Sequence, residues 1–280
     1  MERLERSWRL VKASAAVLQA DVELLVFPAL ASIASLLVVL SFAAPLVLGG
    51  MFDRLVTGGR VGPAAALIGF TFYFVQYFIT IFANSALIGA AMIRLDGGNP
   101  SVGDGLRVAG SRLVPILGWT ALAATVGMVL RSASRRGQGI GRVLFGLVGV
   151  AWSVATFLVV PVVVVEGLGP IDAVRRSVEL LKRTWGEQLS GTIGLWLVFR
   201  IATVILLVVT VPAVVLAAQH QAWAVMAAIV GVAVVGMIAL NLVGTALSAV
   251  FAAAVYRFAA RGAGDGPISA ELVQGAFTPR

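Results

Sequence analysis

The sequence predicts an all-α, polytopic membrane protein with six transmembrane helices and three interfacial amphipathic helices. Three observations support this. Of the 280 residues, 60% are hydrophobic and only 12% are charged, and the mean hydropathy is +1.00; a soluble domain carries about 25% charged residues. Six apolar runs are each long enough to cross roughly 30 Å of hydrocarbon. Amphipathic segments precede the first, third and fifth of these runs.

The apolar runs place the spans near residues 24–48, 66–93, 113–130, 143–165, 189–217 and 222–256. The third run is the weakest, because it is short and contains a proline and two glycines. The sixth is longer than a bilayer requires, so we expect its C-terminal end to tilt or to project into the cytoplasm. Pro161 and Pro212 are expected to kink spans four and five, because proline lacks an amide hydrogen.

The distribution of Lys and Arg predicts a multi-pass protein of the cell (inner, cytoplasmic) membrane with both termini in the cytoplasm. With six spans, 14 basic residues fall on the inner side and six on the outer side, as the positive-inside rule requires. The loop at 131–142 opposes this trend, with four arginines and no acid. If span three did not cross, the counts would be 11 and 9. Six spans are therefore favoured, and the loop indicates either a topology error or an outward-facing basic patch.

Three segments carry an apolar stripe opposite Arg and Lys, which is typical of helices that lie in the membrane interface. The stripes are Leu4, Trp8, Val11, Ala15 and Leu18; Val102, Leu106, Ala109 and Leu113; and Ile171, Val174, Val178, Leu181 and Trp185. Asn99-Pro100 and Gly169-Pro170 are expected to begin the second and third helices, because proline fits the first helical turn. The predicted contacts to anionic lipid headgroups are Arg6, Arg9, Lys12, Arg175, Arg176, Lys182 and Arg183.

The same segments indicate an internal repeat, with chance similarity among apolar segments as the alternative. Residues 6–12 match residues 176–182 at four of seven positions, and residues 85–95 match residues 248–258 at five of eleven. The predicted unit is one amphipathic helix followed by a two-span hairpin. It would occur three times, at about 1–95, 99–168 and 169–258, within a single membrane domain over residues 1–258. The middle copy matches by pattern only, and a polar tail, residues 259–280, follows.

Three stretches, at 7–28, 96–119 and 161–191, resemble an uncharacterised prokaryotic family of six-helix membrane proteins. The resemblance covers nearly the whole chain. A looser likeness is to the membrane domain that accompanies some glycerophosphodiester phosphodiesterases. The catalytic domain of those enzymes is absent from this sequence, so no enzymatic residue is implied. The resemblance implies the six-helix fold and adds no activity.

Four polar side chains fall within the predicted spans. Arg200 lies about eleven residues into the fifth run. It is either near mid-bilayer, as a site for an anionic lipid or solute, or at the interface, if the amphipathic helix continues to about residue 199; the second interpretation is favoured. Gln76, Asn84 and Asn241 are expected to form interhelical hydrogen bonds rather than to line a polar pathway. Small residues predict close helix packing at Ser85, Gly89, Gly244, Ser248 and Ala252.

The types of residue in the sequence exclude several kinds of chemical site. The sequence has no cysteine and one histidine, which excludes disulfides, thiolate ligands and multi-histidine metal sites. Every carboxylate lies at a span end or in a loop, so none is placed for a proton relay. We expect no enzyme activity, cofactor, metal or nucleic-acid partner. The function favoured is a lipid-associated, self-associating structural or scaffold protein, with anionic membrane lipids and a homo-oligomer as partners. The alternatives are a transporter or channel, and an accessory subunit of another membrane protein.

Overall fold

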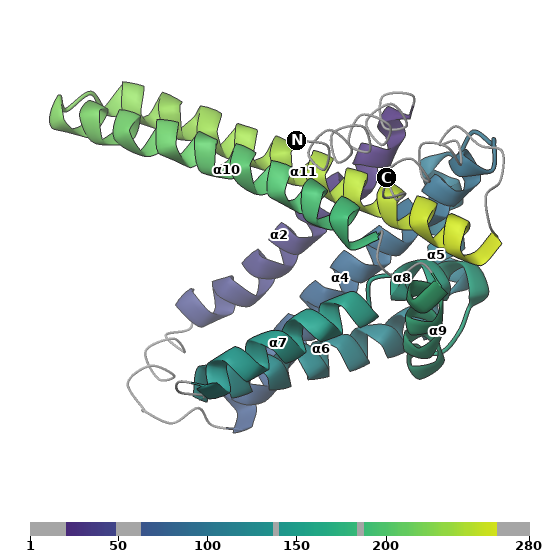
Figure 1. Cartoon of the computed structure of the whole chain (residues 1–280). Coiled ribbons are helices and arrows are strands. Elements are labelled where there is room, and N and C mark those ends of the chain that lie inside the picture. The colour runs from purple at the N-terminus through teal and green to yellow at the C-terminus, as the bar shows by residue number, and fades with distance from the viewer. Residues whose placement is uncertain (1–20, 49–62, 137–139, 184–187, 262–280) are drawn as a thin grey trace. The chain divides into compact units, whose positions relative to one another are not determined.

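The computed structural model describes residues 21–48, 63–136, 140–183 and 188–261, which form helices joined by short turns (Figure 1). These residues contain no strand, and six helical segments among them are long and apolar enough to cross a membrane. Both findings confirm the predicted fold class. The chain divides into two compact units: the bundle unit, Val26–Arg183, and the hairpin unit, Met1–Leu25 with Thr184–Arg280. The predicted single membrane domain over residues 1–258 stays a prediction.

The described residues of the bundle unit form four membrane crossings and two shorter helices. Its helices are α2 (Val26–Leu48), α4 (Pro63–Leu95), α5 (Val102–Ser111), α6 (Leu113–Arg136), α7 (Ile140–Ala155), α8 (Val159–Glu166) and α9 (Pro170–Arg183). The third span, the weakest in the sequence, is α6, a helix of 24 residues. It lies beside α7 (Figure 1), and the rings of Trp119 and Trp152 stack with centroids 6.1 Å apart. The fourth span is not one helix, because α7 ends before α8 begins.

The spans of the bundle unit pack through aromatic rings and a hydrogen bond. The rings of Phe42 in α2 and Phe72 in α4 meet edge to face at 5.3 Å. Gln76 Nε2 in α4 donates to the Ser35 carbonyl in α2 at 3.0 Å. Because lipid tails are as apolar as leucine, such specific contacts hold membrane helices together more than burial does. Leu37 in α2 is exposed, as expected for a lipid-facing side chain.

Helix α5 begins later than Asn99-Pro100, and only part of its predicted apolar stripe is buried against protein. Its N-cap is Ser101, and Ser101 and Asp104 form a capping box. Proline precedes the cap here instead of occupying the first turn. The buried residues are Gly105 and Ala109, which are small, whereas the predicted stripe residues Leu106 and Leu113 are exposed. Ala109 belongs to the predicted stripe, and Gly105 does not, because glycine has no side chain to mark it as apolar.

The small residues of α5 are required by how closely it approaches α4. A Cβ at Gly105 would lie 2.5 Å from Phe27 Cζ and 2.7 Å from the Ala86 carbonyl oxygen. A Cβ at Gly89 in α4 would lie 2.8 Å from Val108 Cγ1. The helix is therefore docked on protein, and its buried side does not face lipid.

The hairpin unit is built from three described helices: η1 (Val22–Leu25), α10 (Gln188–Gln219) and α11 (Trp223–Arg261). α10 and α11 run side by side and are joined by a short turn (Figure 1). α10 passes through Pro212 as one continuous helix, so the predicted kink does not interrupt it. α11 has 39 residues, which at 1.5 Å per residue is about 58 Å, nearly twice the hydrocarbon thickness.

A regular seam joins α10 and α11. Many of the less exposed residues of the two helices recur at alternating spacings of four and three, as in a coiled coil. They are Phe199, Thr203, Leu206, Thr210, Ala213 and Ala217 in α10, and Met226, Ile229, Ala233, Gly236, Leu240 and Val243 in α11. Two glycines fix the register: a Cβ at Gly236 would lie 3.6 Å from Leu206 Cδ2, and one at Gly244 would lie 3.2 Å from Phe199 Cδ1.

The predicted three-fold repeat stays a prediction, because its first amphipathic helix, residues 1–20, lies outside the described residues. Within the bundle unit, α5 and α9 do share features. Each follows a span and packs against it, α5 on α4 and α9 on α8. Each also begins with an Asp–Arg pair at i,i+3, Asp104–Arg107 and Asp172–Arg175.

Gly105→Ala is expected to destabilise the protein by about 1–3 kcal/mol, the usual range for overpacking a tight site. The Ala86 carbonyl belongs to the backbone and cannot turn aside. The matched control is Gly110→Ala in the same helix, where a Cβ would meet nothing within 4 Å; alanine should be neutral or stabilising there by up to about 1 kcal/mol. Unfolding of both variants in mixed detergent measures the difference. Equal stability of the two variants would contradict the described approach of α5 to α4.

Candidate functional site

Polar side chains gather where the spans of the bundle unit meet α5 and α9. We call this group the polar rim; it comprises Ser101, Asp104, Arg107, Arg112, Glu166, Arg176 and Ser177. These residues come from two stretches of the sequence, 101–112 and 166–177. Their contacts form separate groups: the cap of α5, the Arg112 contacts to α8, the Glu166–Arg176 pair, and the Ser177 contacts between α7 and α8.

Helix α9 reaches the rim by docking on the fourth span. It begins at Pro170, as predicted, and the Pro170 ring lies against α6, where a Cβ at Gly118 would be 3.3 Å from Pro170 Cδ. Its fully buried residues include Ala173, Ser177 and Leu180. The predicted stripe residue Ile171 is 61% exposed. Leu181 of the predicted stripe is buried, so the contact face of α9, with Ala173, Ser177 and Leu180, overlaps the predicted stripe in part.

Ser177 repairs the break in the fourth span. Pro161 has no amide hydrogen to donate to residue 157, and the helix is interrupted just before it, between α7 and α8. The predicted kink itself stays a prediction. Ser177 Oγ donates to the Ala155 carbonyl at 2.7 Å and accepts from the Leu158 amide at 3.2 Å. Both backbone groups would otherwise lack these partners in an apolar environment. Sequence reasoning did not single out Ser177; a lone hydroxyl four residues from both Ala173 and Leu181 was the available signal.

An ion pair fixes the C-terminal end of the fourth span. Arg176 Nε lies 3.1 and 3.2 Å from the two carboxylate oxygens of Glu166, and Arg176 Nη1 donates to Glu179 at 3.3 Å. The hydrogen bonds to Glu166 raise the pKa of Arg176 above its usual value. The Arg176 side chain is 29% exposed. This predicted lipid contact is therefore directed chiefly at protein carboxylates.

Arg112 completes the same helix end. Its Nε and Nη2 atoms donate to the carbonyls of Val164 and Val165 at 3.3 and 3.5 Å, which the last turn of a helix leaves without intrahelical partners. Gly167 ends α8 in the left-handed conformation, with φ of 69°. A Cβ at Gly167 would lie 2.5 Å from Arg112 Nη1. Glycine thus meets both the backbone and the space requirement of this cap.

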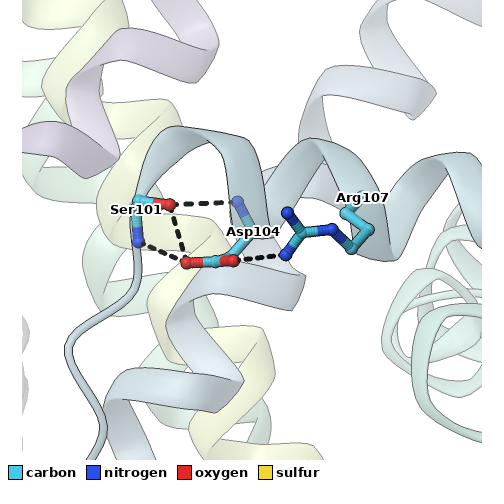
Figure 2. A network of polar contacts seen from close by, with 3 residues as sticks. All are labelled: Ser101, Asp104 and Arg107. Atoms are coloured by element: carbon cyan, nitrogen blue, oxygen red, sulfur yellow. Dashed lines mark hydrogen bonds and ion pairs between the residues drawn. The ribbon is translucent and has the colours of Figure 1, made fainter.

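The capping box of α5 orients an exposed arginine (Figure 2). Asp104 accepts from the Ser101 hydroxyl at 2.6 Å and from the Ser101 amide at 3.1 Å, and Arg107 donates to its other oxygen at 2.7 Å. The hydrogen bonds from Ser101 lower the pKa of Asp104. The cap is therefore complete above the ordinary carboxyl pKa and weakens as the pH falls through the lowered value. The Arg107 side chain remains 79% exposed.

The other predicted lipid contacts divide between two regions. Arg175 is 76% exposed, with Asp172 at 3.7 Å, and Lys182 is exposed as well. Both lie on the side of α9 away from its buried face. Arg6, Arg9 and Lys12 lie outside the described residues, as does the side chain of Arg183.

The predicted intramembrane polar residues are placed differently from one another. Gln76 bridges α4 to α2, as expected of interhelical hydrogen bonding. Asn84 is half-buried in α4. Arg200 and Asn241 are exposed on α10 and α11. Arg200 is the second residue of the fifth candidate span, Phe199–Gln219, and residues 184–187, between α9 and α10, lie outside the described residues.

The two predicted small-residue ridges pack within the chain. Ser85 is fully buried and donates to the Ile81 carbonyl, and Gly89 meets Val108 of α5. Gly244 meets Phe199 within the hairpin. Ser248 is exposed and donates to the Gly244 carbonyl, and Ala252 is buried. The described contacts thus account for Ser85, Gly89 and Gly244 without a second copy of the chain.

The chemistry of the rim is that of helix capping and anion contact. Among the described residues, no three His, Asp or Glu side chains lie together as a metal site would require. The rim's two carboxylates each accept hydrogen bonds from arginine. Of its three guanidinium groups, Arg107 is exposed, whereas Arg112 and Arg176 bond protein oxygens. An exposed guanidinium is suited to phosphate and carboxylate ligands.

Comparisons with known proteins agree with this structural picture. The model of a family of unknown function, DUF6159, matches residues 64–266. This bears out the resemblance to an uncharacterised family; the looser likeness to the membrane domain of glycerophosphodiester phosphodiesterases is not shown. No curated protein and no solved structure matches the chain.

Ser177→Ala is expected to destabilise the protein by about 1–3 kcal/mol, because it removes the partner of one buried amide and one buried carbonyl at once. Ser153→Ala is the matched control, since the Ser153 hydroxyl in α7 is exposed and bonds only its own helix, to the Gly149 carbonyl. Unfolding in mixed detergent measures both variants. A Ser177→Ala variant as stable as Ser153→Ala would show that Ser177 does not hold the break.

Proposed function

The chain belongs to the DUF6159 family of unknown function, and we propose that it is a non-enzymatic structural protein of the cell membrane that binds anionic lipids through α9 and α5. The observation that carries this proposal is the orientation of α9. Its buried side is fixed on protein, so its basic side, with Arg175 and Lys182, is held outward beside the end of a span. A basic amphipathic helix at the membrane surface attracts anionic lipid by about 1 kcal/mol per basic residue.

Docking gives this arrangement an advantage over a free amphipathic helix. A free helix binds lipid with its apolar face and loses conformational entropy when it does so. Helix α9 is already ordered by Ser177 and by the Glu166–Arg176 pair. Its exposed basic groups therefore contact headgroups without that cost. The acids Asp172 and Glu179 lie on the same helix and moderate its charge, so the proposal predicts preference for anionic lipid rather than irreversible attachment.

The predicted cytoplasmic position of both termini and self-association belong to the same proposal. The described packing ridges do not support self-association directly, because their contacts lie within the chain. An accessory-subunit role is compatible with the same surface, with a partner protein in place of part of the lipid. The oligomer mass recorded in the lipid experiment described next distinguishes a self-associating scaffold from a monomer.

The lipid preference is tested with the full chain in nanodiscs that contain phosphatidylglycerol and phosphatidylcholine. Native mass spectrometry of the released protein should show retained lipid enriched in phosphatidylglycerol. Arg175→Gln with Lys182→Gln should reduce the enrichment by up to about thirtyfold, because two exposed charges contribute about 1 kcal/mol each. Asp172→Asn should raise it, because it removes the acid beside Arg175. An unchanged ratio in both variants would refute lipid binding by α9.

A transporter or channel is the second candidate, and the interruption of the fourth span is the observation that favours it. Discontinuous helices form substrate and ion sites in many transporters. The sequence has no cysteine, so single cysteines at positions 153–163 can be probed with a membrane-impermeant maleimide. A water-filled pathway predicts labelling at positions flanking the break, near residues 156–158. Protection throughout this window would exclude a pathway past the break and leave the structural proposal.

A further inference from the structure

We propose that Arg200, Asn241 and Thr245 form a binding site for the phosphate group of a membrane phospholipid on one face of the α10–α11 hairpin. This site goes beyond the lipid contacts of α9. It lies in the other compact unit, and it is defined by the phosphate group rather than by net lipid charge.

Arg200 and Asn241 lie at nearly the same distance from the turn of the hairpin, and this distance sets their depth in the bilayer. Arg200 precedes the end of α10, Gln219, by 19 residues, which is about 28 Å of helix. Asn241 follows the start of α11, Trp223, by 18 residues, or about 27 Å. The register contacts Phe199–Gly244 and Leu206–Gly236 place the two residues at nearly the same level. Both therefore lie about one hydrocarbon thickness from the turn of the hairpin.

The surface between these levels is apolar and open. Large hydrophobic side chains are exposed along both helices from Ile201 to Leu216 and from Trp223 to Ile238. Exposure of this extent fits lipid acyl chains rather than water. The turn, with Gln219, His220 and Gln221, bounds this belt at one end. Arg200 and Asn241 bound it at the other, where the phosphate groups of a bilayer begin.

Arg200, Asn241 and Thr245 lie on the same face of the hairpin. Arg200 lies about 100° around α10 from the centre of the seam, and Asn241 lies about 100° around α11 from its own side of the seam, at 100° per residue. Because the helices run antiparallel, these two offsets turn toward the same side of the hairpin. Thr245 follows Asn241 by four residues, so it lies on the same side, about 6 Å farther from the turn. Arg200, Asn241 and Thr245 are all exposed.

The chemistry of the three side chains fits a phosphate group. A guanidinium, a carboxamide and a hydroxyl are all hydrogen-bond donors, and phosphate oxygens are acceptors that arginine binds with two parallel bonds. Residues 188–261 contain no Asp or Glu, so α10 and α11 themselves add no negative charge beside the site. The acyl chains of the same lipid would lie along the apolar belt.

The test uses the full chain in detergent with a phospholipid that carries a photoreactive group on its headgroup. Crosslinks mapped by peptide mass spectrometry should fall near Arg200 and residues 241–248. Unlabelled phosphatidylglycerol or phosphatidylethanolamine should compete. Diacylglycerol with the same chains should not, because it lacks phosphate, and inorganic phosphate should not, because it lacks chains. Competition by inorganic phosphate would overturn the lipid assignment, and competition by diacylglycerol would overturn the role of the phosphate group.

Variants locate the site. Arg200→Gln and Thr245→Val should each weaken the hairpin crosslink about tenfold, the factor that corresponds to loss of a charged or strongly placed hydrogen bond. Arg200→Lys should retain an intermediate yield, since it keeps the charge and loses the planar fork. The controls are Thr203→Val, in the seam, and Arg131→Gln, in α6; both should stay within about twofold of the wild type. Wild-type yield in Arg200→Gln and Thr245→Val would overturn the proposal.

The outcome is separable from that of the α9 proposal. Arg175→Gln with Lys182→Gln changes lipid enrichment by headgroup charge and should leave the hairpin crosslinks unchanged. Arg200→Gln should do the reverse. Because all the exchanged side chains in the hairpin are exposed or, for Thr203, half-buried, each variant is checked for an unchanged melting temperature. Asn241→Leu, a third site variant, replaces any variant that does not fold and should lower the crosslink yield in the same way.

Discussion

The requirement that every backbone amide and carbonyl within hydrocarbon find a partner inside the protein governs the bundle unit. Continuous helices satisfy it automatically, and the fourth span does not, because Pro161 interrupts it. Ser177 meets the requirement from outside the span, with one hydroxyl that both donates and accepts. A hydroxyl can do this only at hydrogen-bond distance, so α9 has a fixed position and rotation. The exposed position of Arg175 and the pairing of Arg176 with Glu166 follow from that rotation.

Small residues are the second determinant of packing in the bundle unit. They explain why an apolar stripe alone does not predict which face of α5 or α9 is buried on protein. In water, the most apolar face of a helix is normally its buried face, since burial is driven by the hydrophobic effect. At a membrane surface that rule weakens, because large apolar side chains can face lipid. Helices then pack where small residues let their backbones approach closely. Gly105 and Ala109 in α5, and Ala173 in α9, provide close contact. Ile171 and Leu106 are exposed, where lipid rather than protein can cover them.

The fold class and the number of spans were predictable from the sequence because they depend on length and hydropathy, which each segment carries by itself. The start of α9 at Pro170 was predictable for the same reason, since proline acts through its own backbone. The rotation of α5 and α9 was not, because it depends on which residues of another helix come near. The capping role of Arg112 was likewise hidden, since its carbonyl partners lie more than 50 residues away. Gln76 was predictable in part: the sequence indicated that its amide needs a partner on another helix, but not that the partner is the Ser35 carbonyl.

Two apolar stretches, one in each unit, are bounded by polar residues and have the same length. Arg112, directly before α6, and Arg131, within α6, bound an apolar stretch and are separated by 19 residues. In the hairpin, Arg200 and Gln219 bound another stretch with the same separation. Each separation corresponds to about 28 Å of helix, close to the thickness of bilayer hydrocarbon. Packing does not impose this equality, since the two helices belong to different units and have different neighbours. A common solvent layer would impose it, because polar and charged side chains are excluded from hydrocarbon. The phosphate site that we propose at Arg200 fits this common depth.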